Sequence, residues 1–177
     1  NSKYPIYFDF IKRIIRYSIS DKSLKKCFFK NTNSISENEM KLILKENVSN
    51  TILAGIDWPQ KAHTMIGLIR LENLQFCVED VIKNKIEGDF IECGVWRGGA
   101  TIFMRLILKK YEIQDKIVYA ADSFEGLPPP DPEKFPEDEK SKFHTMDVTK
   151  VDLDEVKENF KLYDVLDDGV FFMKGWF

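Results

Sequence analysis

The order of hydrophobic and polar positions in the second half of the chain predicts alternating helices and strands. Apolar residues recur at intervals of three to five from Ile66 to Ile82, which predicts an amphipathic helix over about 65–84, with Thr64 as its N-cap. Short apolar runs then predict buried strands at 90–95, 116–121 and 169–174, and helical patterns at 100–111 and 154–163 separate them. This order predicts a parallel α/β sheet with right-handed crossovers.

Residues 1–63 carry a weaker pattern. The spacing of Ile6, Phe10, Ile14 and Tyr17 predicts a short amphipathic helix, and residues 37–46 predict another. We expect a helical N-terminal extension over 1–63 that packs on the main domain at 64–177, with residues 34–64 as a candidate lid. Binding of the first helix to a membrane surface is the alternative, because Lys12, Arg13 and Arg16 lie beside its apolar positions.

Length, charge and cysteine content exclude several classes of protein. The 177 residues suffice for one domain, and a net charge of −3 does not fit a general nucleic-acid binder. No apolar stretch reaches the roughly 20 residues that span a bilayer. Cys27, Cys77 and Cys93 form no CxxC pair, and His63 and His144 are the only histidines. Disulfides and a multi-histidine metal site are therefore not expected, and free thiols indicate a cytoplasmic protein.

Candidate ligand-binding residues follow the predicted strands, whose carboxyl ends are where such sheets bind ligands. Gly94, Gly98 and Gly99 form a turn that exposes amides at a helix N-terminus. The spacing departs from G-x-G-x-x-G, and Trp96 occupies the position of the second glycine, which argues against a bound pyrophosphate. A nucleoside with a small charged tail, such as S-adenosylmethionine, fits better, and a purely structural turn is the alternative.

Two acidic residues extend this hypothesis. Asp122 ends the second predicted strand, where a carboxylate can accept hydrogen bonds from ribose hydroxyls; a turn or helix-cap role is the alternative. Glu92 interrupts an apolar strand, and a buried charge needs a partner. The ammonium group of the cofactor's methionine is one candidate partner, and a salt bridge with a neighbour such as Arg97 is the other.

Several sequence blocks, in order, resemble the macrocin O-methyltransferase family, whose best-known members methylate sugar hydroxyls on macrolide antibiotics with S-adenosylmethionine and Mg²⁺. The resemblance covers roughly residue 60 to the end of the chain. The matching blocks are Thr64 to Leu68, Arg70 to Gln75, Glu92 to Ala100, Ala121 to Pro130 and Lys174 to Phe177.

The resemblance implies a class I methyltransferase (Rossmann-like) fold and a set of cofactor contacts. It assigns the methionine end of the cofactor to Thr64, Met65, Glu92, Cys93, Gly94, Val95 and Trp96. It assigns the ribose to Asp122, Ser123, Phe124, Glu125 and Gly126, and the adenine to Gly175 and Trp176. For Met65 and Trp176, core packing is the alternative.

Family members continue past the position of Phe177 into further strands, where aspartates hold Mg²⁺ and act on the acceptor hydroxyl. We therefore expect a domain truncated after its third strand, with no metal ligands in this chain and its catalytic residues beyond Phe177. Residues 131–144 are a candidate mobile lid, from which Glu139 and His144 could reach the acceptor; a solvated acidic loop is the alternative.

Together these features predict an S-adenosylmethionine-dependent O-methyltransferase that acts on a hydroxyl of a sugar or natural product, incomplete in this chain. An NAD-dependent oxidoreductase and a non-catalytic cofactor-binding remnant are the alternatives. The expected partner is a small-molecule acceptor, with no nucleic acid or membrane. The acceptor's identity, the methylated position and the existence of a homo-oligomer are left open.

Overall fold

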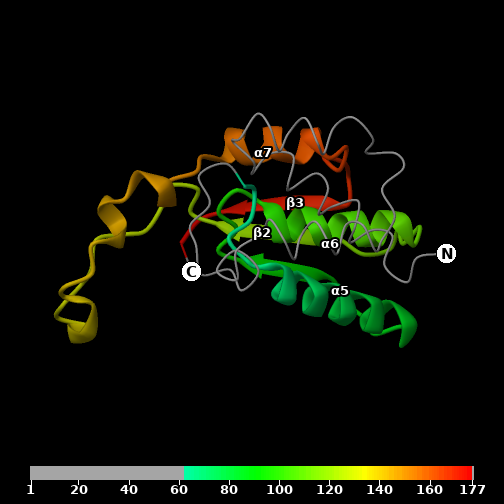
Figure 1. Cartoon of the computed structure of the whole chain (residues 1–177), viewed down its shortest axis with the longest axis horizontal. Coiled ribbons are helices and arrows are strands. Elements are labelled where there is room, and N and C mark those ends of the chain that lie inside the picture. Colours follow the sequence, from blue (N-terminus) through cyan, green and yellow to red (C-terminus); the bar gives the residue numbers. More distant parts are fainter. Residues whose placement is uncertain (1–61, 177) are drawn as a thin grey trace, which may run out of the picture.

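The computed structural model describes residues 62–176, which form three strands and three longer helices, and Figure 1 shows how they are arranged. The expected helices at 6–17 and 37–46, Cys27 and most of the candidate lid at 34–64 lie outside the described residues. The elements are α5 (Leu68–Lys83), β1 (Phe90–Cys93), α6 (Gly99–Lys110), β2 (Val118–Asp122), α7 (Leu153–Leu162) and β3 (Val170–Lys174). None of the described helices is long and apolar enough to cross a membrane.

The predicted parallel α/β sheet is confirmed. The strands lie in the order β1-β2-β3, and both neighbouring pairs are parallel. Phe90 pairs with Val118, and Val118 pairs in turn with Val170, so the three strands run in register. Their carboxyl ends therefore meet at one edge of the sheet, where the segments that follow them can line a common site.

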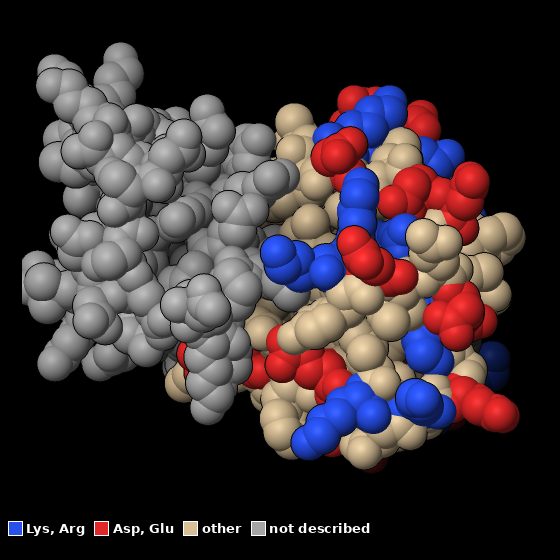
Figure 2. Space-filling view, turned by 90° about the vertical axis from the view of Figure 1, so that its right-hand side faces the viewer, with Lys and Arg blue, Asp and Glu red and all other residues tan. Residues whose placement is uncertain are grey.

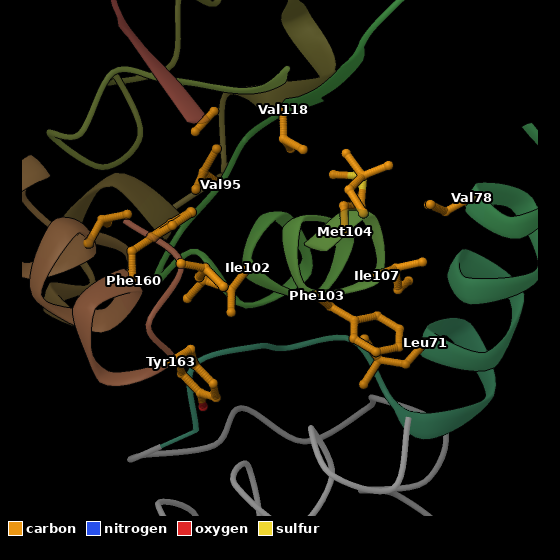
Figure 3. Close-up of a cluster of buried hydrophobic side chains, with 14 of the residues drawn as sticks. Leu71, Val78, Val95, Ile102, Phe103, Met104, Ile107, Val118, Phe160 and Tyr163 are labelled. Carbon is orange, nitrogen blue, oxygen red and sulfur yellow. The ribbon is translucent and has the colours of Figure 1, made fainter. Parts of the chain in front are cut away.

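Helix α6 is the centre of the hydrophobic core (Figure 3). Ile102, Phe103 and Ile107 are completely buried, and each such side chain contributes roughly 1.5–3 kcal/mol through burial. Around them lie Leu71 and Val78 from α5, Val118 from β2, and Phe160 and Tyr163 from α7 and its C-cap. The core thus joins all three helices to one face of the sheet.

The opposite face of the sheet is apolar and exposed. Ile91, Phe171 and Met173 are 57%, 56% and 46% exposed, while their neighbours Phe90 and Phe172 pack against the core. We expected β1 to be buried on both faces; instead its side chains alternate between half-buried and exposed. The reason is that the helices in the described part of the chain all pack on the other face.

Strand β2 begins at Val118 and not at residue 116 as predicted, and two further boundaries near the candidate site are also wrong. Helix α5 begins at Leu68 with Gly67 as its N-cap, and the Thr64 hydroxyl accepts a hydrogen bond from the Ile66 amide instead of capping the helix. Strand β1 ends at Cys93, because Gly94 takes a φ of +85° and turns the chain away from the sheet. At the start of α5 and at the end of β1, the local pattern predicted a longer helix or strand. Tertiary contacts hold an irregular segment there instead.

Candidate functional site

The turn between β1 and α6 uses its glycines for two different purposes. A Cβ atom on Gly98 would lie 2.8 Å from the Phe160 ring, and one on Gly99 would lie 2.3 Å from the His63 carbonyl oxygen. These two positions therefore serve close packing of the turn against α7 and against the segment before α5. Gly94 has no atom within 4 Å of the corresponding position, so it alone leaves the backbone open to an approaching ligand.

Asp122 joins this turn to the end of β2. Its Oδ2 accepts hydrogen bonds from the backbone amides of Val95 at 2.6 Å and Trp96 at 3.2 Å, and its Oδ1 accepts one from the Phe124 amide at 2.9 Å. The carbonyl oxygen of Asp122 accepts a further bond from Gly175, after β3. Asp122 thus has the turn-forming role given as the alternative, and its side chain also lines the cavity described below.

Glu92 lies beneath the turn and has a partner that the sequence did not indicate. Its carboxylate accepts a hydrogen bond from the Thr101 hydroxyl on α6. Burial raises the pKa of Glu92 to about 7, and the nearby Asp122 charge acts in the same direction while the bonds with Thr101 oppose it. The salt bridge with Arg97, one of the two candidate partners, is not formed: the Arg97 guanidinium faces Glu155, with Nε 3.7 Å from Oε1.

Trp96 links the turn to the long loop after β2. Its indole N–H donates a 2.7 Å hydrogen bond to the Val148 carbonyl, and the Arg97 guanidinium lies 4.4 Å from the ring centroid. This distance is that of a cation–π contact. The backbone of Trp96 has a φ of +50°, which is uncommon for a large side chain and indicates that these contacts hold it.

A cavity of about 570 Å³ lies at this edge of the sheet, a size suited to a small-molecule ligand. Its walls contain residues that the sequence nominated and residues that it did not. Those nominated are Met65, Gly94, Trp96, Asp122, Ser123, Gly126 and Trp176. Those missed are Leu127, Pro128, Phe143 and Thr149. The first two directly follow Gly126, so continuing the nominated segment would have found them; nothing local marks Phe143 or Thr149.

The remaining nominated residues surround the cavity without lining it. Val95 and Phe124 are buried behind it, while Cys93 faces the exposed side of the sheet. Thr64 is buried against the turn, and Glu92 lies beneath it. Glu125 forms a 3.0 Å salt bridge with Lys174, and the Gly175 amide donates a hydrogen bond to the Asp122 carbonyl. The nominated segments therefore meet at this edge of the sheet, and only some of the nominated residues line the cavity.

The candidate lid forms a loop that extends away from the domain (Figure 1). Three short 3₁₀ turns lie along the loop between β2 and α7: Pro136–Asp138 within the candidate lid at 131–144, Phe143–Thr145 at its end, and Asp147–Thr149 after it. Glu139 is exposed and His144 half-buried, and neither side chain lines the cavity, whereas Phe143 does. The structure therefore does not bring the two nominated catalytic candidates to the cavity.

A metal-binding cluster or a basic surface would be a further kind of site in the described residues. Within residues 62–176, no group of three or more His, Cys, Asp or Glu side chains is arranged to hold a metal ion, and Cys77 and Cys93 are free thiols. On the face shown in Figure 2, Lys and Arg are interspersed with Asp and Glu. That face has no basic surface of the kind that tracks a nucleic-acid backbone.

Comparison with known proteins identifies the family. The model of the macrocin O-methyltransferase (TylF) family matches residues 5–177. The chain belongs to the macrocin O-methyltransferase family. The match confirms the resemblance carried by the motifs from Thr64 onward and extends it through most of the N-terminal segment. The alternative of an NAD-dependent oxidoreductase is left without support.

Individual relatives of this member of the macrocin O-methyltransferase family are named as O-methyltransferases. It is 40% identical over 178 residues to demethyldecarbamoylnovobiocin O-methyltransferase of Streptomyces niveus, covering 100% of this chain and 64% of the relative. It is 46% identical over 127 residues to mycinamicin III 3''-O-methyltransferase of Micromonospora griseorubida, covering 70% of this chain and 50% of the relative. The chain thus spans between half and two thirds of the length of these relatives.

A solved structure supports the fold. The O-methyltransferase NovP superposes with a TM-score of 0.69 at 48% sequence identity, covering 71% of this chain and 52% of that chain. The likeness confirms the expected Rossmann-like methyltransferase architecture for the α/β part of this family member.

Proposed function

We propose that the chain forms the S-adenosylmethionine-binding part of an O-methyltransferase. The observation that carries this proposal is the cavity between the Gly94 turn and Asp122, at the carboxyl ends of parallel strands, in a member of this family. Ligands of α/β sheets bind at this edge, and the open backbone at Gly94 allows close approach. No pyrophosphate-binding G-x-G-x-x-G turn is present in the sequence, which fits a nucleoside ligand.

The cavity suggests how each part of the cofactor would be held. We place the ribose beside Asp122 and Ser123, the adenine against Trp176 and Leu127, and the methionine end near Met65 and the Gly94 turn, since all of these line the cavity. Thr64, Glu92, Cys93, Val95, Phe124, Glu125 and Gly175 act from behind or beside this surface. We assign residues 1–63 to an N-terminal extension of the same protein.

Glu92 would act mainly through its charge. With a pKa near 7, its carboxyl group is only partly ionised at neutral pH. A cationic ligand near the turn would favour the ionised form, so ligand and carboxylate stabilise each other. Ligand binding is therefore expected to release a proton from Glu92.

When bound, S-adenosylmethionine supplies an electrophilic methyl group for an acceptor hydroxyl. The residues of this chain contribute by fixing the donor's position and by excluding water, and positioning accounts for much of the rate gain in two-substrate reactions. Met65, Phe143 and Trp176 supply apolar surface for that exclusion. We assign no step to Mg²⁺, because the described residues do not assemble a ligand set for it.

The acceptor we propose is a hydroxyl on a sugar or glycosylated natural product. The support is the activity for which the relatives are named. They include the 8-demethyl-8-(2,3-dimethoxy-alpha-L-rhamnosyl)-tetracenomycin-C 4'-O-methyltransferase of Streptomyces olivaceus, 47% identical over 126 residues. We further propose that the protein works in the cytoplasm on this small molecule, without nucleic acid or membrane.

Isothermal titration calorimetry with S-adenosylhomocysteine and with NAD tests the cofactor assignment. We expect one S-adenosylhomocysteine per chain and no heat from NAD. The titration repeated in buffers of different ionisation enthalpy measures the proton released from Glu92. Binding of NAD in place of S-adenosylhomocysteine would contradict the proposal.

A further inference from the structure

Three polar residues on one face of α7 and its C-cap hold the two segments that border the methionine end of the cavity. Glu155, Asn159 and Tyr163 are spaced four residues apart, so their side chains lie along one side of the helix. None of them lines the cavity. Their partners are residues of the segment before α5 and of the turn between β1 and α6.

Tyr163 reaches the segment before α5. Its hydroxyl lies 2.9 Å from Nδ1 of His63, and the two rings meet edge to face with centroids 5.5 Å apart. Both side chains are buried, Tyr163 at 1% exposure and His63 at 8%. His63 is two residues before Met65, which lines the cavity, so the hydrogen bond holds the base of that wall.

Asn159 reaches the turn. Its Nδ2 donates a 3.0 Å hydrogen bond to the Arg97 carbonyl. Arg97 in turn donates through Nη1 to the Ala62 carbonyl at 3.1 Å, and its Nε lies 3.7 Å from Glu155. The contacts therefore form a closed path from α7 through the turn to residue 62 and back through His63.

The two held segments also touch each other directly. The carbonyl oxygen of His63 and the Cβ of Thr64 lie so close to Gly99 that a side chain there would overlap both. A shift of α7 relative to either segment therefore changes the spacing between Met65 and the Gly94 turn. Val156 and Phe160 of α7 also pack closely against Gly98 in the turn, so apolar packing and the polar contacts act on the same separation.

We propose that Tyr163 and Asn159 are positioning residues, which set the affinity for the amino-acid end of an S-adenosyl nucleoside by holding the 62–65 segment and the 95–99 turn at a fixed separation. This inference rests on the proposed function. The adenosine end of the ligand, which we place at Asp122 and Trp176, is not held by the 62–65 segment: Asp122 bonds instead to the turn, at Val95 and Trp96. Tyr163, which holds the 62–65 segment, therefore affects the two ends of the ligand differently.

The test compares two ligands that differ only at the amino-acid end. S-Adenosylhomocysteine carries that end, whereas 5'-methylthioadenosine has the adenosine and thioether without it. For Tyr163→Phe, which removes one hydroxyl, we expect S-adenosylhomocysteine to bind about three- to tenfold more weakly, the range for one buried hydrogen bond. The affinity for 5'-methylthioadenosine should stay within about twofold.

Tyr119→Phe is the matched control, because Tyr119 is a partly buried tyrosine of β2 that stacks with Phe171 on the other face of the sheet. It should change neither affinity. Asn159→Ala is the second variant, to be measured if Tyr163→Phe does not fold. We expect it to weaken S-adenosylhomocysteine binding more than 5'-methylthioadenosine binding, by a smaller margin because Asp122 bonds to the turn that Asn159 holds.

The outcomes separate the two proposals. Equal losses for both ligands, or no loss for either, would overturn the positioning role while leaving cofactor binding intact. Failure of the unsubstituted protein to bind S-adenosylhomocysteine would instead refute the proposed function, and the positioning role with it.

Discussion

The carboxylate of Asp122, at the end of β2, accepts a 2.6 Å hydrogen bond from the backbone amide of Val95, in the turn after β1. The two residues come from neighbouring strands whose carboxyl ends lie side by side. Trp96 and Phe124 donate to the same carboxylate. One side chain therefore shapes the turn and also faces the cavity, so its effects on folding and binding have to be measured together.

Asp122→Ala should weaken S-adenosylhomocysteine binding by about 1.5–3 kcal/mol, the range for hydrogen bonds to a charged group. It should also lower the free energy of unfolding, since three backbone amides lose their acceptor. Calorimetry and urea denaturation measure the two effects. Asp138→Ala, on the exposed loop, is the control and should change neither. Unchanged affinity in a variant with a native circular dichroism spectrum would refute the ribose assignment.

Glu92→Gln should stabilise the protein in a pH-dependent way. The pKa of Glu92 is about 7 in the folded state, above its ordinary value of 4.5, so its contribution to stability is present below about pH 4.5 and lost as the pH rises through 7. At pH 8 the variant should exceed the unsubstituted protein by about 1–3 kcal/mol in free energy of unfolding. The difference should shrink towards pH 5.

Urea denaturation of both proteins at pH 5 and pH 8 tests this prediction. The contributions of the other titrating groups to the free energy of unfolding cancel in the difference between the two proteins. The same variant should bind S-adenosylhomocysteine more weakly, because a neutral amide attracts an ammonium group less than a carboxylate does. A difference in stability that is the same at both pH values would show that the charge of Glu92 is not the cause.

Gly99→Ala should displace the segment before α5. The new Cβ would lie 2.3 Å from the His63 carbonyl oxygen and 2.5 Å from the Thr64 Cβ, so the backbone has to move. We expect a loss of about 1–3 kcal/mol in free energy of unfolding, as for overpacked sites. Gly175→Ala is the control, because no atom lies within 4 Å of the added methyl group. Equal thermal stability of the two variants would argue against this close contact.

The apolar sheet face should make the isolated chain of 177 residues self-associate. Ile91 and Phe171 are each more than half exposed on this face, and within residues 62–176 only β2 pairs with β1. Size-exclusion chromatography with light scattering should detect oligomers, and Ile91→Lys combined with Phe171→Lys should shift the distribution towards monomer. A monomeric, cooperatively unfolding chain without the substitutions would contradict the prediction.

The sequence by itself determined the order of strands and helices, the glycine turn, the acidic strand end at Asp122, and the family. Each of these depends on local chemistry: apolar periodicity, glycine at positive φ as at Gly94, and short motifs in a set order. These features can be predicted from the sequence because they depend on residues that are close together along the chain. The predicted start of α5 is wrong, because Gly67 and not Thr64 is the N-cap of that helix.

Only the tertiary structure decided which side chains meet. It paired Glu92 with Thr101 in place of Arg97, brought Phe143 and not Glu139 or His144 to the cavity, and placed Tyr163 against His63, a hundred residues away in the chain. The helix periodicity at 154–163 predicts an apolar face but does not predict which segment that face will cover. The direction in which helices cross a sheet, and the path of a long loop, depend on the packing of the whole core, which no local pattern encodes.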